Sequence, residues 1–250
     1  MSAWYLACGF WEDKTMGKLM QSLSIAPAET HSVALAGAGG KTTLLFALAR
    51  EAMRDGLRVA VTTTTHILCP GEQDDLFVTV EEDLPGIDRA FQSGRIIIAG
   101  TPAPEGKLSV PCPQVLRHLR ENADLLLYEA DGSHRMPVKF PNDTEPVILP
   151  GTDRVIAVAG LSALGQPLHR VCQRYERAVE ALGLSANQNV DPMVAASLLL
   201  GGYGHYKGLT VLLNQADTPK LQKLGEQIAE LLRSGGVAST IVASLQQEAF

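Results

Sequence analysis

The sequence alternates between short apolar runs and longer stretches in which apolar and polar residues recur at helical spacing. The apolar runs predict buried strands at residues 33–36, 58–61, 95–100, 124–128, 154–160 and 209–213, with shorter strands at 77–80 and 237–242. Strands that are apolar throughout and alternate with helices are typical of a parallel sheet covered on both faces. The pattern therefore predicts an α/β fold with a mostly parallel central sheet flanked by helices.

Helices are expected between these runs, and proline and glycine mark several of their ends. The expected helices cover residues 44–50, 81–93, 111–122, 171–182, 191–200 and 218–233. Thr218-Pro219 combines an N-cap side chain with a proline in the first turn, which favours a helix start. Gly201-Gly202 is predicted to end the fifth helix because glycine is a poor helix former. Residues 101–107 are expected to form a turn region.

A glycine-rich segment joins the first strand to the first helix. It matches G-x-x-G-K-T, as in Mur-type ligases, whereas the longer form G-x-x-x-x-G-K-[ST] would need glycine in place of Leu35. Glycines let backbone N–H groups converge on phosphate oxygens, and the helix N-terminus adds its positive dipole end. We expect Lys41 to reach the β- and γ-phosphates and the Thr42 hydroxyl to bind Mg²⁺. The predicted nucleotide-binding residues are Gly37, Ala38, Gly39, Gly40, Lys41, Thr42 and Thr43, and the alternative is a turn that binds nothing.

The apolar run at residues 124–128 leads directly into two acidic residues. Glu129 and Asp131 lie two positions apart, so on an extended chain their side chains point the same way. Carboxylates at such a strand end complete the Mg²⁺ shell of nucleotide-binding domains or orient a water molecule. Glu129 and Asp131 are therefore predicted to be catalytic together with Lys41, and to bind metal together with Thr42. Two solvent-exposed carboxylates at a strand end are the alternative.

Other polar residues follow strands at the edge where α/β sheets bind ligands. Thr65 and His66 end a threonine-rich segment and are predicted site residues, with an ordinary β-rich strand as the alternative. Lys139 follows the acidic pair and is expected to contact phosphate or an anionic substrate. Asn214 and Asp217 belong to Asn-Gln-Ala-Asp, which resembles the N-K-x-D motif that reads guanine, although glutamine replaces its lysine. They are predicted to bind the nucleotide, and a polar turn is the alternative.

Composition narrows the classes of function and partner. A net charge of −6 and an isoelectric point near 5.5 argue against binding to nucleic acid or to an anionic membrane surface. No apolar run approaches the ~18 residues of a membrane span. The four cysteines lie far apart, which predicts reduced thiols in a cytoplasmic protein. Residues 1–27 fit no later element and are expected to be an extension, poorly ordered, of a single domain at residues 28–250.

Several motifs together resemble one protein family. They are Gly-Ala-Gly-Gly-Lys-Thr-Thr at 37–43, Thr-Thr-Thr-Thr-His at 62–66, Glu-Ala-Asp-Gly-Ser at 129–133, Pro-Val-Lys at 137–139, Glu-Pro-Val at 145–147 and Asn-Gln-Ala-Asp at 214–217. In this order they resemble the selenium-dependent hydroxylase accessory proteins of the YqeC type. The resemblance implies a cytoplasmic P-loop protein involved in maturation of selenium- or molybdenum-dependent hydroxylases. By the same analogy, Lys41, Thr42, Glu129 and Asp131 would be the nucleotide and metal residues.

Three functions are consistent with these features. The first is a nucleoside triphosphatase that uses Mg²⁺ and ATP or GTP and acts on a hydroxylase or its cofactor as a maturation factor. The second is an ATP-dependent ligase or kinase that activates a small anionic substrate. The third is a nucleotide-binding regulator without significant turnover.

Overall fold

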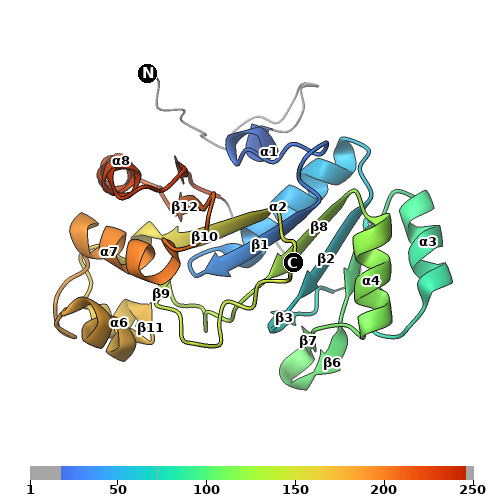
Figure 1. Ribbon diagram of the computed structural model, residues 1–250, viewed down its shortest axis with the longest axis horizontal. Helices are drawn as coiled ribbons and strands as arrows, with labels where there is room; N and C mark the ends of the chain where they lie inside the picture. The colour runs from blue at the N-terminus through green and yellow to red at the C-terminus, as the bar shows by residue number, and fades with distance from the viewer. Residues whose placement is uncertain (1–17, 72, 246–250) are drawn as a thin grey trace.

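An eight-stranded sheet forms the centre of the computed structural model, which describes residues 18–71 and 73–245 (Figure 1). Its strands are β1 Ser32–Gly37, β2 Val59–Thr63, β4 Leu76–Thr79, β5 Ile96–Ala99, β8 Leu125–Glu129, β10 Arg154–Gly160, β12 Thr210–Asn214 and β13 Ser239–Val242. They lie in the order β13-β12-β10-β1-β8-β2-β5-β4, and every neighbouring pair is parallel. The predicted α/β fold is confirmed and is consistent with that of P-loop NTPases.

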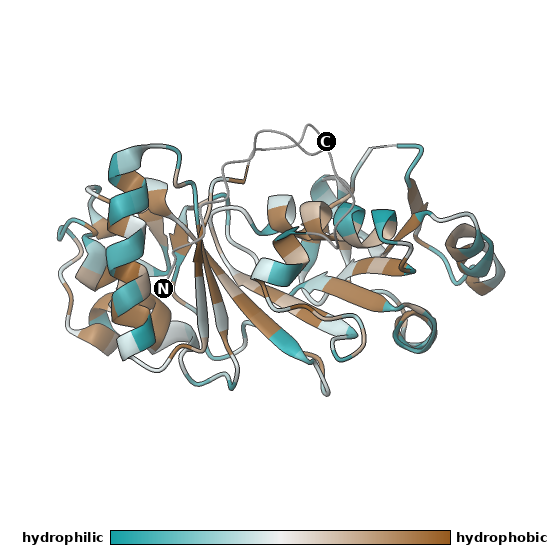
Figure 2. Ribbon diagram, turned by 90° about the horizontal axis from the view of Figure 1, so that it is seen from above, coloured by the Kyte–Doolittle hydropathy of each residue, from teal (hydrophilic) through white to brown (hydrophobic). Residues whose placement is uncertain are grey.

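The inner strands are buried on both faces, which explains their apolar sequences. On β1, Ala34 and Ala36 belong to one hydrophobic cluster, whereas Val33 and Leu35 belong to another on the opposite face. Successive side chains of a strand point to opposite faces, so a strand covered on both faces needs an apolar residue at every position. Figure 2 shows the strands as mostly hydrophobic and the helices as striped with hydrophilic residues.

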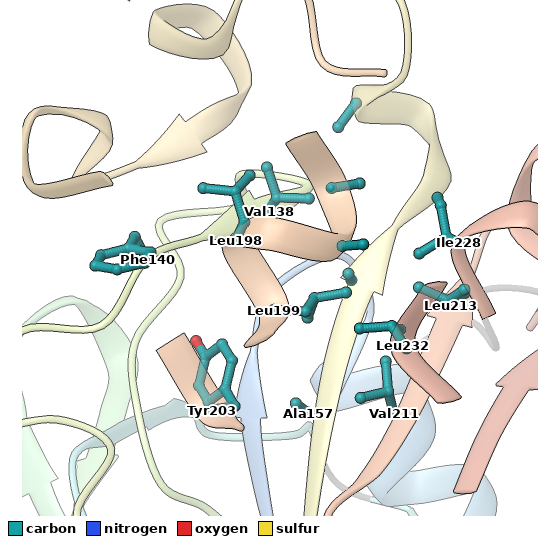
Figure 3. Close-up of a cluster of buried hydrophobic side chains, with 14 of the residues drawn as sticks. Val138, Phe140, Ala157, Leu198, Leu199, Tyr203, Val211, Leu213, Ile228 and Leu232 are labelled. Atoms are coloured by element: carbon teal, nitrogen blue, oxygen red, sulfur yellow. The ribbon is translucent and has the colours of Figure 1, made fainter. Parts of the chain in front are cut away.

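Helices cover both faces of the sheet. They are α1 Lys18–Ser22, α2 Lys41–Arg54, α3 Leu84–Gln92, α4 Pro113–Asn122, α5 Leu168–Val171, α6 Tyr175–Leu182, α7 Pro192–Tyr203 and α8 Pro219–Ser234. Side chains of α1 and α2 share one cluster with β1 and β8, while α7 and α8 pack on the other face against β10 and β12. Figure 3 shows this second contact, in which Leu199, Ile228 and Leu232 lie near Val211 and Leu213. No helix in the described part of the chain is long and apolar enough to cross a membrane.

The short helix α1 packs against α2. Leu19, Met20 and Leu23 are buried in the cluster around α2. The carboxylate of Glu51 on α2 accepts hydrogen bonds from the backbone N–H of Leu19 (3.2 Å) and of Met20 (2.6 Å). Residues 1–17 lie outside the described residues, so the division into an extension at 1–27 and a domain at 28–250 stays a prediction.

Two further small sheets lie beside the large one. β3 His66–Leu68, β7 Lys107–Ser109 and β6 Thr101–Ala103 form an antiparallel sheet. The region 101–107, predicted as a turn, therefore contains the strand β6, a turn at Pro104–Gly106 and the first residue of β7. β9 Val138–Lys139 pairs with β11 Cys172–Gln173. This pairing explains why the helix predicted at 171–182 begins only at Tyr175.

The predicted break at Gly201-Gly202 is wrong, because α7 continues through both glycines to Tyr203. A Cβ atom at Gly202 would lie 2.7 Å from Cδ of Pro141, and one at Gly201 would lie 2.8 Å from a methyl group of Leu182. Glycine at both positions allows close packing. This packing outweighs the cost of glycine in a helix, which is about 1 kcal/mol relative to alanine.

Candidate functional site

The order of the strands brings the predicted site residues to one edge of the sheet. β1 lies between β8 and β10, and β12 follows β10. In register, Leu35 is opposite Glu129, Gly37 is opposite Val158, and Gly160 is opposite Asn214. Because all four strands are parallel, their carboxyl ends meet here, where open α/β sheets bind ligands.

The glycine-rich loop at residues 37–40 adopts a conformation that requires glycine. Gly37, Gly39 and Gly40 have φ values of 90°, 77° and 131°, a region that other residues rarely adopt. A Cβ atom at Gly39 would lie 2.3 Å from the backbone nitrogen of Gly160. The loop is held by hydrogen bonds from the N–H of Ala38 to Val158 (2.9 Å) and from that of Gly39 to the Met136 carbonyl (3.2 Å).

Four backbone N–H groups at the start of α2 have no acceptor among the described residues. They belong to Gly40, Lys41, Thr42 and Thr43, and the first bond of the helix runs from Leu44 N–H to the Gly40 carbonyl (2.9 Å). These donors and the positive end of the helix dipole favour an anion at this position. Binding of phosphate by these residues stays a prediction.

The side chain of Lys41 lies across the loop rather than in solvent. Its ammonium donates to the Gly37 carbonyl (2.6 Å) and lies 3.0 Å from Oδ1 of Asp131. Lys41 is 3% exposed and Asp131 is 0% exposed. The other oxygen of Asp131 accepts from the backbone N–H of Gly37 (3.0 Å). Asp131 therefore connects the end of β8 to both the backbone and the lysine of the loop.

A chain of charges leads from Asp131 to a second part of the edge. The ammonium of Lys139 lies 3.1 Å from Oδ2 of Asp131 and donates to Oε2 of Glu145 (2.8 Å). The same oxygen accepts from Arg174 (2.8 Å). Burial tends to raise the pKa of Glu145, but the hydrogen bonds and charges of Lys139 and Arg174 outweigh it, and the pKa is lowered. Lys139 thus contacts two carboxylates of the chain, Asp131 and Glu145, and its expected contact with phosphate or an anionic substrate stays a prediction.

Glu129 faces the first turn of α2. Its Oε1 accepts from the Thr42 hydroxyl (2.5 Å), and the residue is 5% exposed. Burial raises the pKa of Glu129, and the charge of Asp131 adds to this; the charge of Lys41 and the Thr42 hydrogen bond act in the opposite direction. Glu129 and Asp131 thus face the loop together, as their spacing predicts.

The threonine-rich segment contributes differently from what the sequence indicates. Thr64, rather than Thr65, contacts the site: its N–H donates to the Glu129 carbonyl (3.0 Å) and its hydroxyl to the Val147 carbonyl (2.8 Å). The buried hydroxyl of Thr65 has no partner in the described part of the chain. His66 begins β3 and is paired with Ser109. Roles for Thr65 and His66 at the site stay predictions.

Asn214 connects the loop to the C-terminal segment. Its amide nitrogen donates to the Gly39 carbonyl (2.9 Å), and its oxygen accepts from the N–H of Leu245 (2.9 Å). The carboxylate of Asp217 accepts from the Ser244 hydroxyl. No local pattern in the sequence points to Ser244 or Leu245, because their contacts depend on the pairing of β13 with β12. Gln215 points elsewhere and accepts from the Ser162 hydroxyl (2.6 Å).

The donor atoms at this edge are of the kind that suits a hard cation. Within residues 18–71 and 73–245, no group of three or more His, Cys, Asp and Glu side chains could hold a metal ion by itself. The oxygen atoms of Thr42, Glu129 and Asp131 nevertheless lie around the loop. Mg²⁺ in nucleotide sites is bound by one or two carboxylates together with substrate phosphates, so these residues fit such an ion.

Comparison with known proteins identifies the family. The family model described as "YqeC protein" matches residues 33–176. The chain belongs to the YqeC family. A relative from Escherichia coli (strain K12), described as "Uncharacterized protein YqeC", is 30% identical over 187 residues, which cover 71% of this chain and 70% of the relative. The matched region contains the glycine-rich loop, the acidic pair and Lys139, and the resemblance inferred from the motifs is confirmed.

Proposed function

We propose that this YqeC-family chain binds a nucleoside triphosphate with Mg²⁺ and hydrolyses it. The observation that carries the proposal is the position of Lys41. It begins α2, where the N–H groups of residues 40–43 have no acceptor among the described residues, and it faces the carboxylate of Asp131. The ammonium group of Lys41 would serve as a counter-ion to a triphosphate bound at the loop, as in P-loop proteins. An ordinary strand-to-helix turn has no need of a lysine and an aspartate that are both buried.

Thr42 and Glu129 are the proposed metal-binding pair. The hydroxyl and the carboxylate already meet at 2.5 Å, and both are hard oxygen ligands. Asp131 contacts Lys41, Lys139 and the Gly37 N–H. Its main proposed role is therefore to orient Lys41, and its secondary proposed role is to bind the metal ion. Mg²⁺, when bound, would supply positive charge that stabilises the phosphate oxygens during hydrolysis.

Glu129 is the residue proposed to orient the attacking water. Its Oε1 is engaged by Thr42, and the described residues provide no hydrogen-bond partner for Oε2. Burial raises the pKa of this carboxyl group, which makes it a better proton acceptor than an exposed glutamate once it is ionised.

The proposed accessory role rests on the resemblance of the motifs to the YqeC-type accessory proteins rather than on the geometry of the site. We propose that nucleotide turnover in the cytoplasm serves the maturation of a selenium- or molybdenum-dependent hydroxylase or the handling of its cofactor. A switch of this kind needs only a loop whose contacts change between triphosphate and diphosphate. The charge chain from Lys41 to Arg174 would respond to such a change, because Asp131 is shared by Lys41 and Lys139.

A ligase or kinase is the second candidate, and a cavity supports it. A cavity of about 200 Å³ is lined by Asn142, Glu145, His205 and Tyr206, and Glu145 is bonded to Lys139. A small polar substrate there would lie at the far end of the charge chain from the loop. This function predicts turnover that depends on a second substrate.

Phosphate release with Mg²⁺ and ATP or GTP tests the proposal. Glu129→Gln should retain nucleotide binding and lower turnover by about 10²–10⁴-fold, the usual contribution of a general base. Glu226→Gln removes an exposed carboxylate from α8 and is the matched control. Equal turnover in Glu129→Gln and wild type would refute the assignment of Glu129. Binding without turnover, with or without a partner enzyme, would favour the regulator over the hydrolase.

A further inference from the structure

The turn at residues 133–136 connects the acidic end of β8 to the glycine-rich loop. Its closing hydrogen bond runs from the N–H of its last residue to the carbonyl of its first (2.9 Å). The Met136 carbonyl accepts from the N–H of Gly39 (3.2 Å), and the following carbonyl, that of Pro137, accepts from the N–H of Gly160 (2.7 Å). The turn is therefore fixed to the backbone around the loop and not only to the end of β8.

The two central residues of this turn, His134 and Arg135, have a backbone conformation that favours other residue types. Their φ values are 48° and 60°. Positive φ at both central positions is typical of a type I′ turn, in which asparagine and glycine are preferred because a Cβ atom is crowded there. Histidine adopts positive φ more readily than most residues, whereas arginine has no such preference. Glycine at position 135 would form this turn more easily, so the backbone does not explain the arginine.

The side chain of Arg135 is available to a ligand. It is exposed, and its guanidinium has no hydrogen bond or ion pair within the described residues. By contrast, Lys41, Lys139 and Arg174 each contact a carboxylate of the chain. Arg135 therefore keeps its positive charge and its N–H donors for a group that the described part of the chain does not supply.

The position of the turn brings this charge within reach of a phosphate at the loop. The Cα atoms of Arg135 and Met136 are about 3.8 Å apart, and the Met136 carbonyl is bonded to Gly39. The N–H groups of residues 40–43 follow directly, and an extended arginine side chain spans about 7 Å, the length of two extended residues. A γ-phosphate at those N–H groups could therefore contact Lys41 from the loop and Arg135 from the turn, and a guanidinium can bind two phosphate oxygens at once.

We propose that Arg135 is a catalytic residue whose guanidinium binds the γ-phosphate and stabilises the charge that develops on its oxygens during hydrolysis. An arginine of the same chain has this role in some nucleotide hydrolases. A water oxygen bonds to the γ-phosphorus while the bond to the bridging oxygen breaks, its electron pair stays on the diphosphate, and Glu129 accepts a proton from the water. The role of Arg135 rests on the proposed function, because it requires a triphosphate at residues 40–43.

Phosphate release by the full-length chain, with Mg²⁺ and ATP or GTP, tests this role in two neighbouring variants. Arg135→Gly and His134→Gly each place glycine at a positive φ in the same turn, so both should melt close to or above the wild-type temperature. Arg135→Gly should lower turnover by about 10³-fold or more, the usual contribution of such an arginine, whereas His134→Gly should turn over like wild type. Arg135→Lys keeps the charge without the planar two-point contact and should retain only part of the activity.

Titration calorimetry tests the same contact without turnover. The ligands are AMP-PNP and GMP-PNP, triphosphate analogues with an imido group between the β- and γ-phosphorus atoms, and the diphosphates ADP and GDP. Arg135→Gly should weaken binding of the analogue by about tenfold, the effect of one hydrogen bond to a charged group. Its affinity for the diphosphate should be unchanged, because only the analogue carries a γ-phosphate. Arg233→Ala, which removes an exposed arginine from the last turn of α8, should match wild type in both assays.

The outcomes separate the role of Arg135 from the function on which it rests. If wild type hydrolyses nucleotide and Arg135→Gly does so equally well, the proposed function stands and the role of Arg135 is wrong. Equal losses of turnover in Arg135→Gly and His134→Gly would assign the effect to the turn and also overturn the role. If wild type binds the analogue without turnover, a selective loss of affinity for it in Arg135→Gly supports the contact with the γ-phosphate, and unchanged affinity refutes it. If wild type binds no nucleotide, both proposals fail.

Discussion

The carboxylate of Asp131 lies 3.0 Å from the ammonium of Lys41, and neither side chain is exposed to solvent by more than 3%. Two buried charges of opposite sign are costly to remove from water, and their attraction repays the cost only with good geometry and additional hydrogen bonds. Here the Gly37 carbonyl and N–H supply those bonds. The pair therefore holds the loop in shape and keeps a lysine beside a helix N-terminus.

Asp131→Asn should destabilise the chain strongly. Lys41 and Lys139 would remain buried without their shared counter-ion, and breaking a buried pair in this way costs about 3–5 kcal/mol. Urea denaturation measures the loss. Asp143→Asn is the control, because Asp143 forms an ion pair with Arg177 at the surface and should cost less than about 1 kcal/mol. Similar losses in the two variants would contradict the importance of the buried pair.

Gly40→Ala should prevent nucleotide binding while Gly56→Ala should not. Gly40 has φ of 131°, and an added Cβ would lie 2.2 Å from the Asn214 amide. Gly56 also has a positive φ of 85°, but no atom lies within 4 Å of a Cβ added there. Both variants carry backbone strain of about 1–3 kcal/mol, and only the first distorts the loop. Thermal shift with Mg²⁺ and GTP or ATP compares them, and equal ligand-induced shifts would count against the loop as the phosphate site.

Glu129→Gln should change how stability depends on pH. Burial raises the pKa of Glu129 above its ordinary value of 4.5. Below pH 4.5 the carboxyl group of residue 129 is protonated in both the folded and the unfolded wild type. Above pH 4.5 it ionises first in the unfolded chain, so the free energy of unfolding of wild type falls until the carboxyl group of the folded protein ionises as well. The free energy of unfolding of Glu129→Gln relative to wild type should therefore rise as pH increases from below 4.5. Denaturation across this pH range measures it, and a constant or falling difference would disagree.

The sheet and the loop could be predicted because their signals are local. Apolar runs such as 154–160 are needed wherever a strand is covered on both faces, and the G-x-x-G-K-T pattern specifies a turn that only glycine allows. Glu129 and Asp131 could be placed on one side from their spacing alone. These features depend only on residues that are close together in the sequence and on the backbone geometry common to all strands and glycine turns.

The remaining contacts depend on residues that are distant in sequence. Asp131 meets Lys139, and Glu145 meets Arg174, through loops whose paths no local pattern indicates. Gly201 and Gly202 were expected to end a helix, but packing against Pro141 and Leu182 decides their conformation. Ser244 reaches Asp217 only because β13 pairs with β12. Tertiary packing overrides local propensity in each case.

Binding of triphosphate at residue 41 is the central claim, and titration calorimetry of wild type and Lys41→Ala tests it most directly. Mg²⁺ with GTP and with ATP serve as ligands, circular dichroism checks that the variant is folded, and Lys223→Ala, an exposed lysine on α8, is the control. Wild type and the control should bind at least one triphosphate, and Lys41→Ala should weaken it by more than about tenfold, the loss of a charge-assisted contact. Unchanged affinity in a folded Lys41→Ala variant would contradict the account.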